Sequence, residues 1–362
     1  DLWYILLYPL VTVHTTSMNI LPSIPLVVIS ALVIFSPLQE GGTTHSSQMI
    51  IRLLIVLWLG IVLAQGIRVG SFNVPMLSVG YIALSFVGLA LVATLFSPYP
   101  HPSRQWLLMI VGYVTFFYLL VTFVDRWEHV RTLTVVIVLM GIGEAGWAIL
   151  QGLAWNVVRP TGTFFNPNFL AGYLTVTWAI LLSVAIYGYR QVPACSRRWM
   201  SPVLWWLGLS TALGGLFLAV LLTQSRGGMV VFVVGSVFVL TARYGWKLAG
   251  SCAAVVVLLG LFVPTPIRDR VLAEHQQNPV SYARWQMWQG AIAQMVDHPL
   301  GIGLGLYQYT YPLYAFPVEG EISRFGKVAQ TPHNDYLQMG VEMGVGAILV
   351  FVAGVVLVIR EL

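Results

Sequence analysis

Long uncharged hydrophobic segments are the feature of this sequence that most constrains its fold. Crossing the hydrocarbon core of a membrane takes about 20 apolar residues, and segments of that kind recur along the whole chain. They lie near residues 20–36, 48–66, 75–97, 105–124, 132–153, 168–187, 201–223, 228–243, 247–264 and 336–359. Because 58% of the residues are hydrophobic and only 9% are charged, a soluble fold is implausible. We predict an all-α integral membrane protein, a polytopic bundle of about 10–12 transmembrane helices.

One long polar stretch interrupts this pattern. Residues 265–335 are expected to form a single loop inserted before the final span. The chain as a whole, residues 1–362, is predicted to be one polytopic membrane domain. Because the sequence starts at Asp1 without a methionine and stops at Leu362 just after a hydrophobic segment, we expect one or both ends to be trimmed. The start has neither the basic segment nor the cleavage site of a signal peptide.

The basic residues predict the orientation of this loop, since arginine and lysine favour the cytoplasmic ends of spans. With the long loop outside, the inside ends carry Arg68, Arg126, Arg131, Arg190, Arg197, Arg198, Arg243, Lys247 and Arg360. The outside ends carry fewer, namely Arg52, Arg104, Arg159 and Arg226. We therefore expect a periplasmic loop on a multi-pass protein of the cell inner (cytoplasmic) membrane. The net charge of +5 follows from this bias, and no nucleic-acid partner is expected.

Residues 281–297 of the loop have the spacing of an amphipathic helix. Arg284 lies at the edge of the apolar stripe. The stripe itself consists of Trp285, Trp288, Ile292, Met295 and Val296. Such a helix would lie on the bundle or in the lipid headgroup layer. Residues 307–327, which are rich in tyrosine and proline, are expected to form a mobile lid or a surface loop.

A glycine-rich run, residues 301–305, follows the helix. Glycines at this spacing also occur in dinucleotide-binding loops, but no strand–turn–helix unit surrounds them here. The run is either a flexible turn beneath a ligand or a plain connector, and we favour the connector.

Arg226 lies between two predicted spans with almost no connecting loop. A charge at that depth is costly and usually faces a cavity or a partner. The alternative is an arginine that only reaches the lipid headgroups. Arg226 and Arg284 have planar, permanently charged side chains, which suit the oxygens of a phosphate.

His333 stands at the entrance of the last predicted span. Imidazole is the side chain that exchanges protons near neutral pH, so His333 is either a catalytic base or a structural residue at the membrane interface. Asn334 and Asp335 beside it would orient the ring or cap the following helix. We favour Asp335 as the N-cap.

Two further groups of polar residues have open roles. Asn168 is the predicted cap of the span that starts there, and a ligand-facing role for Asn166 is secondary. Glu144 and Glu342 lie within predicted spans, where acids mark ion paths or are buried and hydrogen-bonded. The histidines are too scattered for a metal site, and we expect neither a metal nor a cofactor.

Taken in order, several of these motifs resemble the O-antigen ligase and O-antigen polymerase superfamily. The resemblance covers roughly residues 160–350 and the multi-span architecture. Its motifs are Ser225-Arg226-Gly227-Gly228, Arg284-Trp285 with Trp288, the run from His298 to Gly305, and Pro332-His333-Asn334-Asp335-Tyr336-Leu337. The segment from Thr163 to Gly172 is similar to another segment common in that family.

The resemblance implies an inverting, metal-independent membrane glycosyltransferase. It would transfer a glycan from undecaprenyl diphosphate to an acceptor hydroxyl, which is lipid A-core for a ligase. Carried over by motif, Arg226 and Arg284 would bind the donor diphosphate and His333 would be the catalytic residue. The candidate supporting residues are Asn166, Asn334, Asp335 and Tyr336.

Other activities remain as alternatives. In a polymerase the acceptor is another carrier-linked repeat unit, and in an O-oligosaccharyltransferase it is a protein hydroxyl. A membrane transporter would also be polytopic, with interrupted helices and buried acids near a central site. We favour glycosyl transfer over transport, because the sequence has no internal repeat and a long exported loop is superfluous for transport. Among the glycosyltransferases of this superfamily, we favour the ligase over the polymerase.

Overall fold

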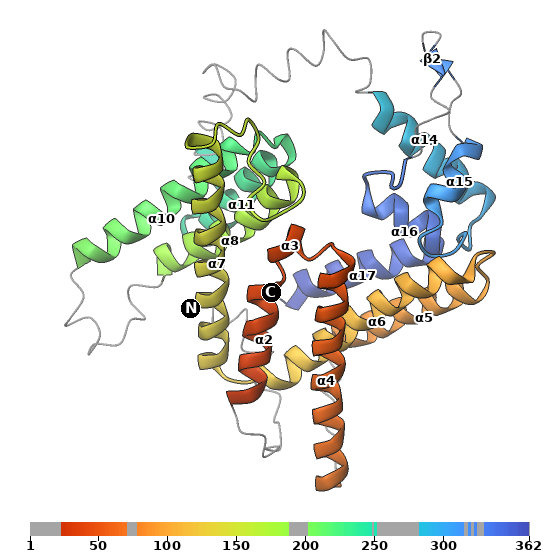
Figure 1. The fold of residues 1–362 in the computed structure, drawn as a ribbon, viewed down its shortest axis with the longest axis horizontal. Coiled ribbons are helices and arrows are strands. Elements are labelled where there is room, and N and C mark those ends of the chain that lie inside the picture. Colours follow the sequence, from red (N-terminus) through yellow and green to blue (C-terminus); the bar gives the residue numbers. More distant parts are fainter. Residues whose placement is uncertain are drawn as a thin grey trace. The chain divides into compact units, whose positions relative to one another are not determined.

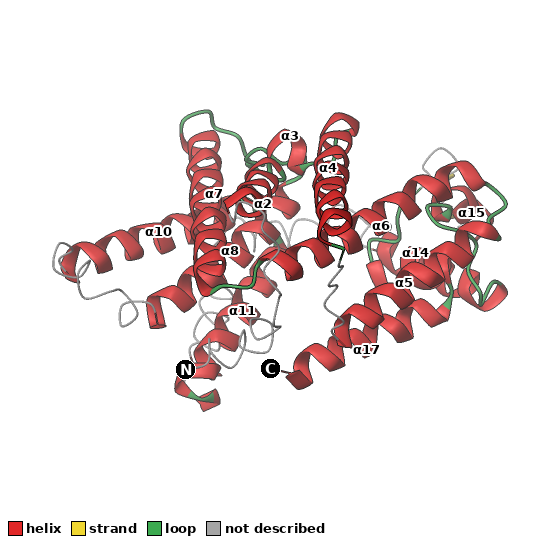
Figure 2. Cartoon of the chain, turned by 90° about the horizontal axis from the view of Figure 1, so that it is seen from below, coloured by secondary structure: helices red, strands yellow, loops and turns green. Residues whose placement is uncertain are grey.

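The computed structural model describes residues 23–70, 78–187, 202–247, 250–251, 282–314, 318–319, 322–323 and 329–361. Within these ranges the chain consists almost entirely of helices joined by short loops (Figure 2). The described strands are β1 (Val318–Glu319) and β2 (Ile322–Ser323), which pair antiparallel with Val318 opposite Ser323. The chain divides into two compact units, and each is described by itself.

Unit 2 contains the described residues within Leu21–Leu54 and Trp127–Ala273. Its longer helices are α2 (Ser23–Phe35), α7 (Trp127–Leu153), α8 (Pro167–Tyr187), α10 (Pro202–Leu222) and α11 (Arg226–Tyr244). Helix α8 packs against α7, α10 and α11 (Figure 1). The short helix α3 (Leu38–Gly41) also belongs to this unit, and α4 (His45–Val69) contains the boundary between the units at Leu54 and Ile55.

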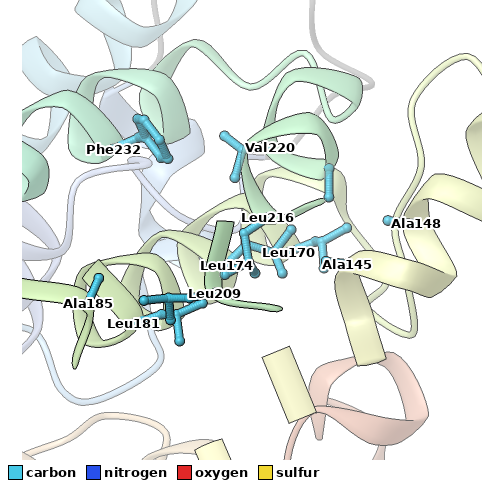
Figure 3. Close-up of a cluster of buried hydrophobic side chains, with 11 residues drawn as sticks. Ala145, Ala148, Leu170, Leu174, Leu181, Ala185, Leu209, Leu216, Val220 and Phe232 are labelled. Atoms are coloured by element: carbon cyan, nitrogen blue, oxygen red, sulfur yellow. The ribbon is translucent and has the colours of Figure 1, made fainter. Parts of the chain in front are cut away.

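The core of unit 2 is made of aliphatic side chains from these packed helices (Figure 3). Leu170 and Leu174 of α8 and Leu216 of α10 are fully buried there. Full burial of a leucine side chain contributes about 1.5–3 kcal/mol. The core therefore fixes α8 and the two segments that enter α8 and α11, which carry Asn166 and Arg226.

Unit 1 contains the described residues within Ile55–Arg126 and Glu274–Leu362. Its helices are α5 (Ser78–Leu95), α6 (Pro100–Phe123), α14 (Tyr282–Asp297), α15 (Tyr307–Tyr314), α16 (Asp335–Met343) and α17 (Val345–Glu361). Helix α5 packs against α6 and α17, and α16 packs against α14 and α17. Two clusters of buried residues, centred on Ala347 and on Tyr307, hold these helices together.

Within the described ranges, seven helices are long and apolar enough to cross a membrane: α4, α5, α6, α7, α8, α10 and α11. Helices α2 and α17 are apolar but shorter. Large side chains such as Leu53, Val92 and Val234 stay exposed on these helices, as expected for surfaces that contact lipid. The prediction of an all-α polytopic membrane protein is confirmed. The predicted span at 247–264 lies almost entirely outside the described residues.

The final predicted span, 336–359, is divided in the structure. Helix α16 ends at Met343, Gly344 has φ +85°, and α17 begins at Val345. The hydrophobic pattern does not predict this break, because the residues on both sides of it are apolar. The cause is a long-range contact: the Val345 N–H donates to the Pro299 carbonyl at 3.2 Å. A Cβ at Gly344 would stand 2.7 Å from that same carbonyl oxygen, so the chain can turn here only with glycine.

Candidate functional site

His333 is an exposed residue held between two hydrogen-bonded neighbours. Before it, the Pro332 carbonyl accepts a hydrogen bond from Trp288 Nε1 at 3.0 Å. After it, Asn334 Oδ1 accepts the backbone N–H groups of Tyr336 and Leu337. His333 itself has φ +52°, a left-handed conformation that few non-glycine residues adopt, although histidine is enriched among them. Both neighbours therefore fix an unusual backbone position that presents the imidazole outward.

The N-cap of α16 is Asn334, and the prediction of Asp335 as the cap is wrong. Asn334 has extended backbone angles, and its side chain bonds two of the first N–H groups of the helix, at 3.1 and 3.3 Å. Asp335 is the first residue of α16 and is exposed, where its negative charge suits the positive end of the helix dipole. Tyr336 is also exposed and stands edge-on to Phe351 of α17.

The predicted amphipathic helix is present as α14, but its buried face differs from the predicted stripe. Met287, Ala291 and Gln294 are buried against the unit, because this face packs against α15 and α16. From the predicted stripe, Trp285 (57% exposed), Ile292 (47%) and Val296 (74%) point outward. Hydrophobicity alone missed the buried face because Gln294 belongs to it: its Oε1 accepts a hydrogen bond from Thr310 Oγ1.

Arg284 is the third residue of α14, and its side chain lies outside the described residues. One turn further along the helix, Trp288 makes the hydrogen bond to Pro332 described above. The structure therefore brings the helix that carries Arg284 to the loop that carries His333.

The glycine-rich run is a buried connector, which confirms the favoured interpretation. Its N–H groups bond to the end of α16: Ile302 to the Val341 carbonyl at 2.9 Å, and Gly303 to the Glu342 carbonyl at 3.1 Å. A Cβ at Gly301 would stand 2.7 Å from the Glu342 carbonyl oxygen. The run packs too closely against backbone to leave space for a nucleotide.

Glu342 is one of the residues that hold this connector. Its carboxylate is buried and accepts the Gly305 N–H at 2.8 Å and the Gln338 amide at 3.2 Å. Of the two roles open for this acid, the contacts support the buried and hydrogen-bonded one. The beginning of the predicted lid, 307–314, is likewise packed: it forms α15, with Tyr307 fully buried. A surface loop is the wrong description for that part, and residues 315–317, 320–321 and 324–327 lie outside the described residues.

In unit 2, Arg226 is the first residue of α11 and is exposed. The preceding Ser225 is the N-cap, and its side chain accepts the Gly228 N–H at 3.1 Å. Gln224 has φ +52°, the same left-handed conformation that His333 adopts before its own capped helix. The tight turn 223–225 therefore presents Arg226 at the amino end of α11.

Arg159 makes two contacts in this region that the sequence pattern does not predict. Its Nε donates to the Thr223 carbonyl at 3.1 Å, and its Nη2 donates to Asn168 Oδ1 at 3.2 Å. The available signal is a charge in a short loop between predicted spans, the same signal that singles out Arg226. No family motif surrounds Arg159, so the sequence predicts no site role for it.

The N-cap of α8 is Asn166, and the prediction of Asn168 as the cap is wrong. Asn166 Oδ1 accepts the Asn168 N–H at 2.8 Å, and α8 begins at Pro167. Proline fits the first helical position because it has no N–H to satisfy. Asn168 instead accepts a hydrogen bond from Arg159, and Asn166 has the capping role that was predicted for Asn168.

The loop before Asn166 is held by two polar side chains of α7. Glu144 is buried, and its two oxygens contact the N–H and the hydroxyl of Thr163 at 3.0 and 2.6 Å. Gln151 Oε1 accepts the N–H groups of Thr161 and Gly162. These contacts favour the hydrogen-bonded role for Glu144 and give the loop a fixed path to α8.

The predicted site residues thus form two local groups. The α14 segment that carries Arg284 and the residues from His333 to Tyr336 belong to unit 1, while Arg226 and Asn166 belong to unit 2. Each group includes a capped helix start, that of α16 in unit 1 and those of α8 and α11 in unit 2.

Comparison with known protein families gives a match to part of the chain. The family model described as O-antigen ligase matches residues 209–352. This match supports membership of the O-antigen ligase and polymerase superfamily. Arg226, Arg284 and His333 all lie inside the matched segment, whereas Asn166 lies before it. No curated protein matches the chain. The family consists of glycosyltransferase-like enzymes of membranes.

Proposed function

We propose that this protein transfers a glycan from undecaprenyl diphosphate to an acceptor hydroxyl at the outer face of the cytoplasmic membrane. The preferred acceptor is lipid A-core. The observation that carries the proposal is His333: an exposed imidazole, held in a fixed backbone position, inside the segment matched by the O-antigen ligase family.

The chemistry needs one proton acceptor and stabilisation of one leaving group. The acceptor oxygen attacks the anomeric carbon from the face opposite the diphosphate, so the configuration inverts. A new C–O bond forms as the bond to the diphosphate oxygen breaks. The hydroxyl proton passes to an imidazole nitrogen of His333, and the carrier leaves as undecaprenyl diphosphate. General base catalysis of this kind contributes about 10²–10⁴-fold.

Arg226 and Arg284 are the proposed partners of the diphosphate. Negative charge grows on the leaving diphosphate as the glycosidic bond breaks, and fixed cations stabilise it. A guanidinium group can bind two phosphate oxygens at once. Support for this role comes from the family motifs at both positions and, for Arg226, from its exposed place at the amino end of α11, where the helix dipole also favours an anion.

The direct test supplies the purified protein with undecaprenyl diphosphate glycan and separate acceptors. We expect glycan transfer to lipid A-core without added metal and with EDTA present. Transfer only to a second carrier-linked glycan would identify a polymerase, and transfer only to a protein hydroxyl would identify an oligosaccharyltransferase. No transfer to any of these acceptors would contradict the proposal.

The proposed orientation is tested by labelling single cysteines. After removal of Cys195 and Cys252, Ser323→Cys should react with an impermeant thiol reagent on intact cells, and Ser196→Cys should react only after the membrane is opened. Ser196 lies in the inside loop predicted from the basic residues, outside the described residues, and Ser323 lies in β2. The reverse labelling pattern would place His333 in the cytoplasm, away from the proposed acceptor.

A further inference from the structure

We infer that Arg159 is a positioning residue that holds the turn carrying Arg226. The inference rests on the proposed role of Arg226 in binding the donor diphosphate, and it adds a residue that lies outside the family-matched segment 209–352. Arg159 is separated from this turn by more than sixty residues in the sequence, and the contacts between them are within unit 2.

Two nitrogens of the Arg159 guanidinium bond to two different segments. Nε donates to the carbonyl of Thr223, which is fully buried at the end of α10 and lies three residues before Arg226. Nη2 donates to the side chain of Asn168 in the first turn of α8. Hydrogen bonds from a charged donor are stronger than neutral ones. Arg159 thus joins the end of α10 to the start of α8.

A second hydrogen bond, donated by the turn to the segment that carries Arg159, also joins the two. Gln224 Nε2 donates to the Val158 carbonyl at 3.1 Å. Two hydrogen bonds therefore join the turn 223–225 to the segment 158–159. One is donated by the Arg159 side chain and the other by the Gln224 side chain. Gln224 is the residue with φ +52° directly before the cap of α11, so this contact also holds an uncommon backbone conformation.

The segment that carries Arg159 is itself fixed. Gln151 and Glu144 of α7 hold residues 161–163, and Pro160 is buried. Because the loop 159–163 is held in place, the bond from Arg159 also holds the turn before α11 in place. Without the Arg159 contact, the turn before α11 would keep the Gln224 bond to Val158 and the Ser225 cap, but it would lose its connection to α8 through Asn168.

A positioning role has a distinct kinetic signature. If Arg226 contacts the diphosphate equally in the bound donor and in the transition state, loss of its alignment weakens donor binding and leaves the chemical step unchanged. We expect Arg159→Ala to raise the donor KM by roughly tenfold and to change kcat by less than about twofold. Arg159→Lys should recover little, because one ammonium group cannot serve both Thr223 and Asn168 in the geometry of a fork.

The experiment measures donor kinetics and hydrogen exchange in the same purified full-length variants. In Arg159→Ala the amides of Gly228 and Met229, which bond to Ser225 in the wild type, should exchange about tenfold faster. Asn168→Ala removes one of the two bonds and should give a smaller rise in both measurements. Arg104→Ala is the matched control: its bond is to the Pro100 carbonyl within its own helix, and neither measurement should change.

A double variant tests whether Arg159 affects donor binding through Arg226 or by contacting the donor itself. In an Arg226→Ala background, Arg159→Ala should cause no further rise in the donor KM. Additive effects, or unchanged exchange at residues 228–229, would overturn the positioning role. If the wild type transfers no glycan, the proposed function fails, while the exchange measurement still decides whether Arg159 holds the turn. Should Arg159→Ala fail to fold, Arg159→Lys and Asn168→Ala provide the same comparison.

Discussion

Replacing His333 is expected to reduce the transfer rate by about 10²–10⁴-fold, the usual contribution of a general base. The donor should still bind, because the proposed diphosphate contacts belong to Arg226 and Arg284. The expected change is therefore in kcat at saturating donor, measured with purified variants and radiolabelled glycan. EDTA should leave the wild-type rate unchanged.

The backbone of His333 determines which substitution tests this most cleanly. Alanine tolerates the left-handed φ of +52° poorly, so His333→Ala changes both the loop and the chemistry. Asparagine adopts this conformation readily but accepts no proton near neutral pH. His333→Asn should therefore keep the loop and lose the activity. A fully active His333→Asn enzyme would show that another group takes the proton.

Asp335 is the rival base, since it lies two residues from His333 and is exposed. The cap of α16 is Asn334, so Asp335→Asn removes a charge without removing the cap. This variant should retain most of the activity. An inactive Asp335→Asn enzyme together with an active His333→Asn enzyme would reverse the assignment. Asn334→Ala should lower the stability of α16 by about 1 kcal/mol through loss of the cap.

Replacing either proposed diphosphate-binding arginine is expected to weaken use of the donor strongly. Hydrogen bonds to charged groups contribute about 1.5–3 kcal/mol, which corresponds to roughly 10–100-fold in the donor kcat/KM for each of Arg226→Ala and Arg284→Ala. Lysine at either position should recover only part of this loss, because a point charge cannot bind two oxygens in a fork. Steady-state kinetics at varied donor concentration measure the effect.

Ser225→Ala is the matched control for Arg226. It removes the hydrogen bond to Gly228 at the start of α11 and should cost about 1 kcal/mol of stability. The donor kcat/KM should fall less than in Arg226→Ala, because the guanidinium group is still present. Full activity of Arg226→Lys would show that Arg226 only anchors the helix end to lipid headgroups.

Local sequence patterns determined the fold class and much of the candidate site. Hydrophobic segments alone predict a membrane-spanning helical protein, because lipid leaves the backbone few other ways to satisfy its polar groups. The helical spacing of the stripe from Trp285 to Val296 predicts a helix whose bounds, 281–297, agree with α14 to within one residue. Motif order placed Arg226, Arg284 and His333 in a segment that the family match also covers.

Tertiary contacts decided the features that the sequence patterns do not contain. The buried face of α14 includes Gln294 because Thr310 of α15 supplies a hydrogen-bond partner. The break at Gly344 exists because the carbonyl of Pro299 occupies the space beside it. The contact between Arg159 and Thr223 joins residues far apart in the chain. In each case the contact partner is distant in the sequence. Local hydrophobicity and helix propensity depend only on neighbouring residues, so they cannot predict which distant group packs at a given position.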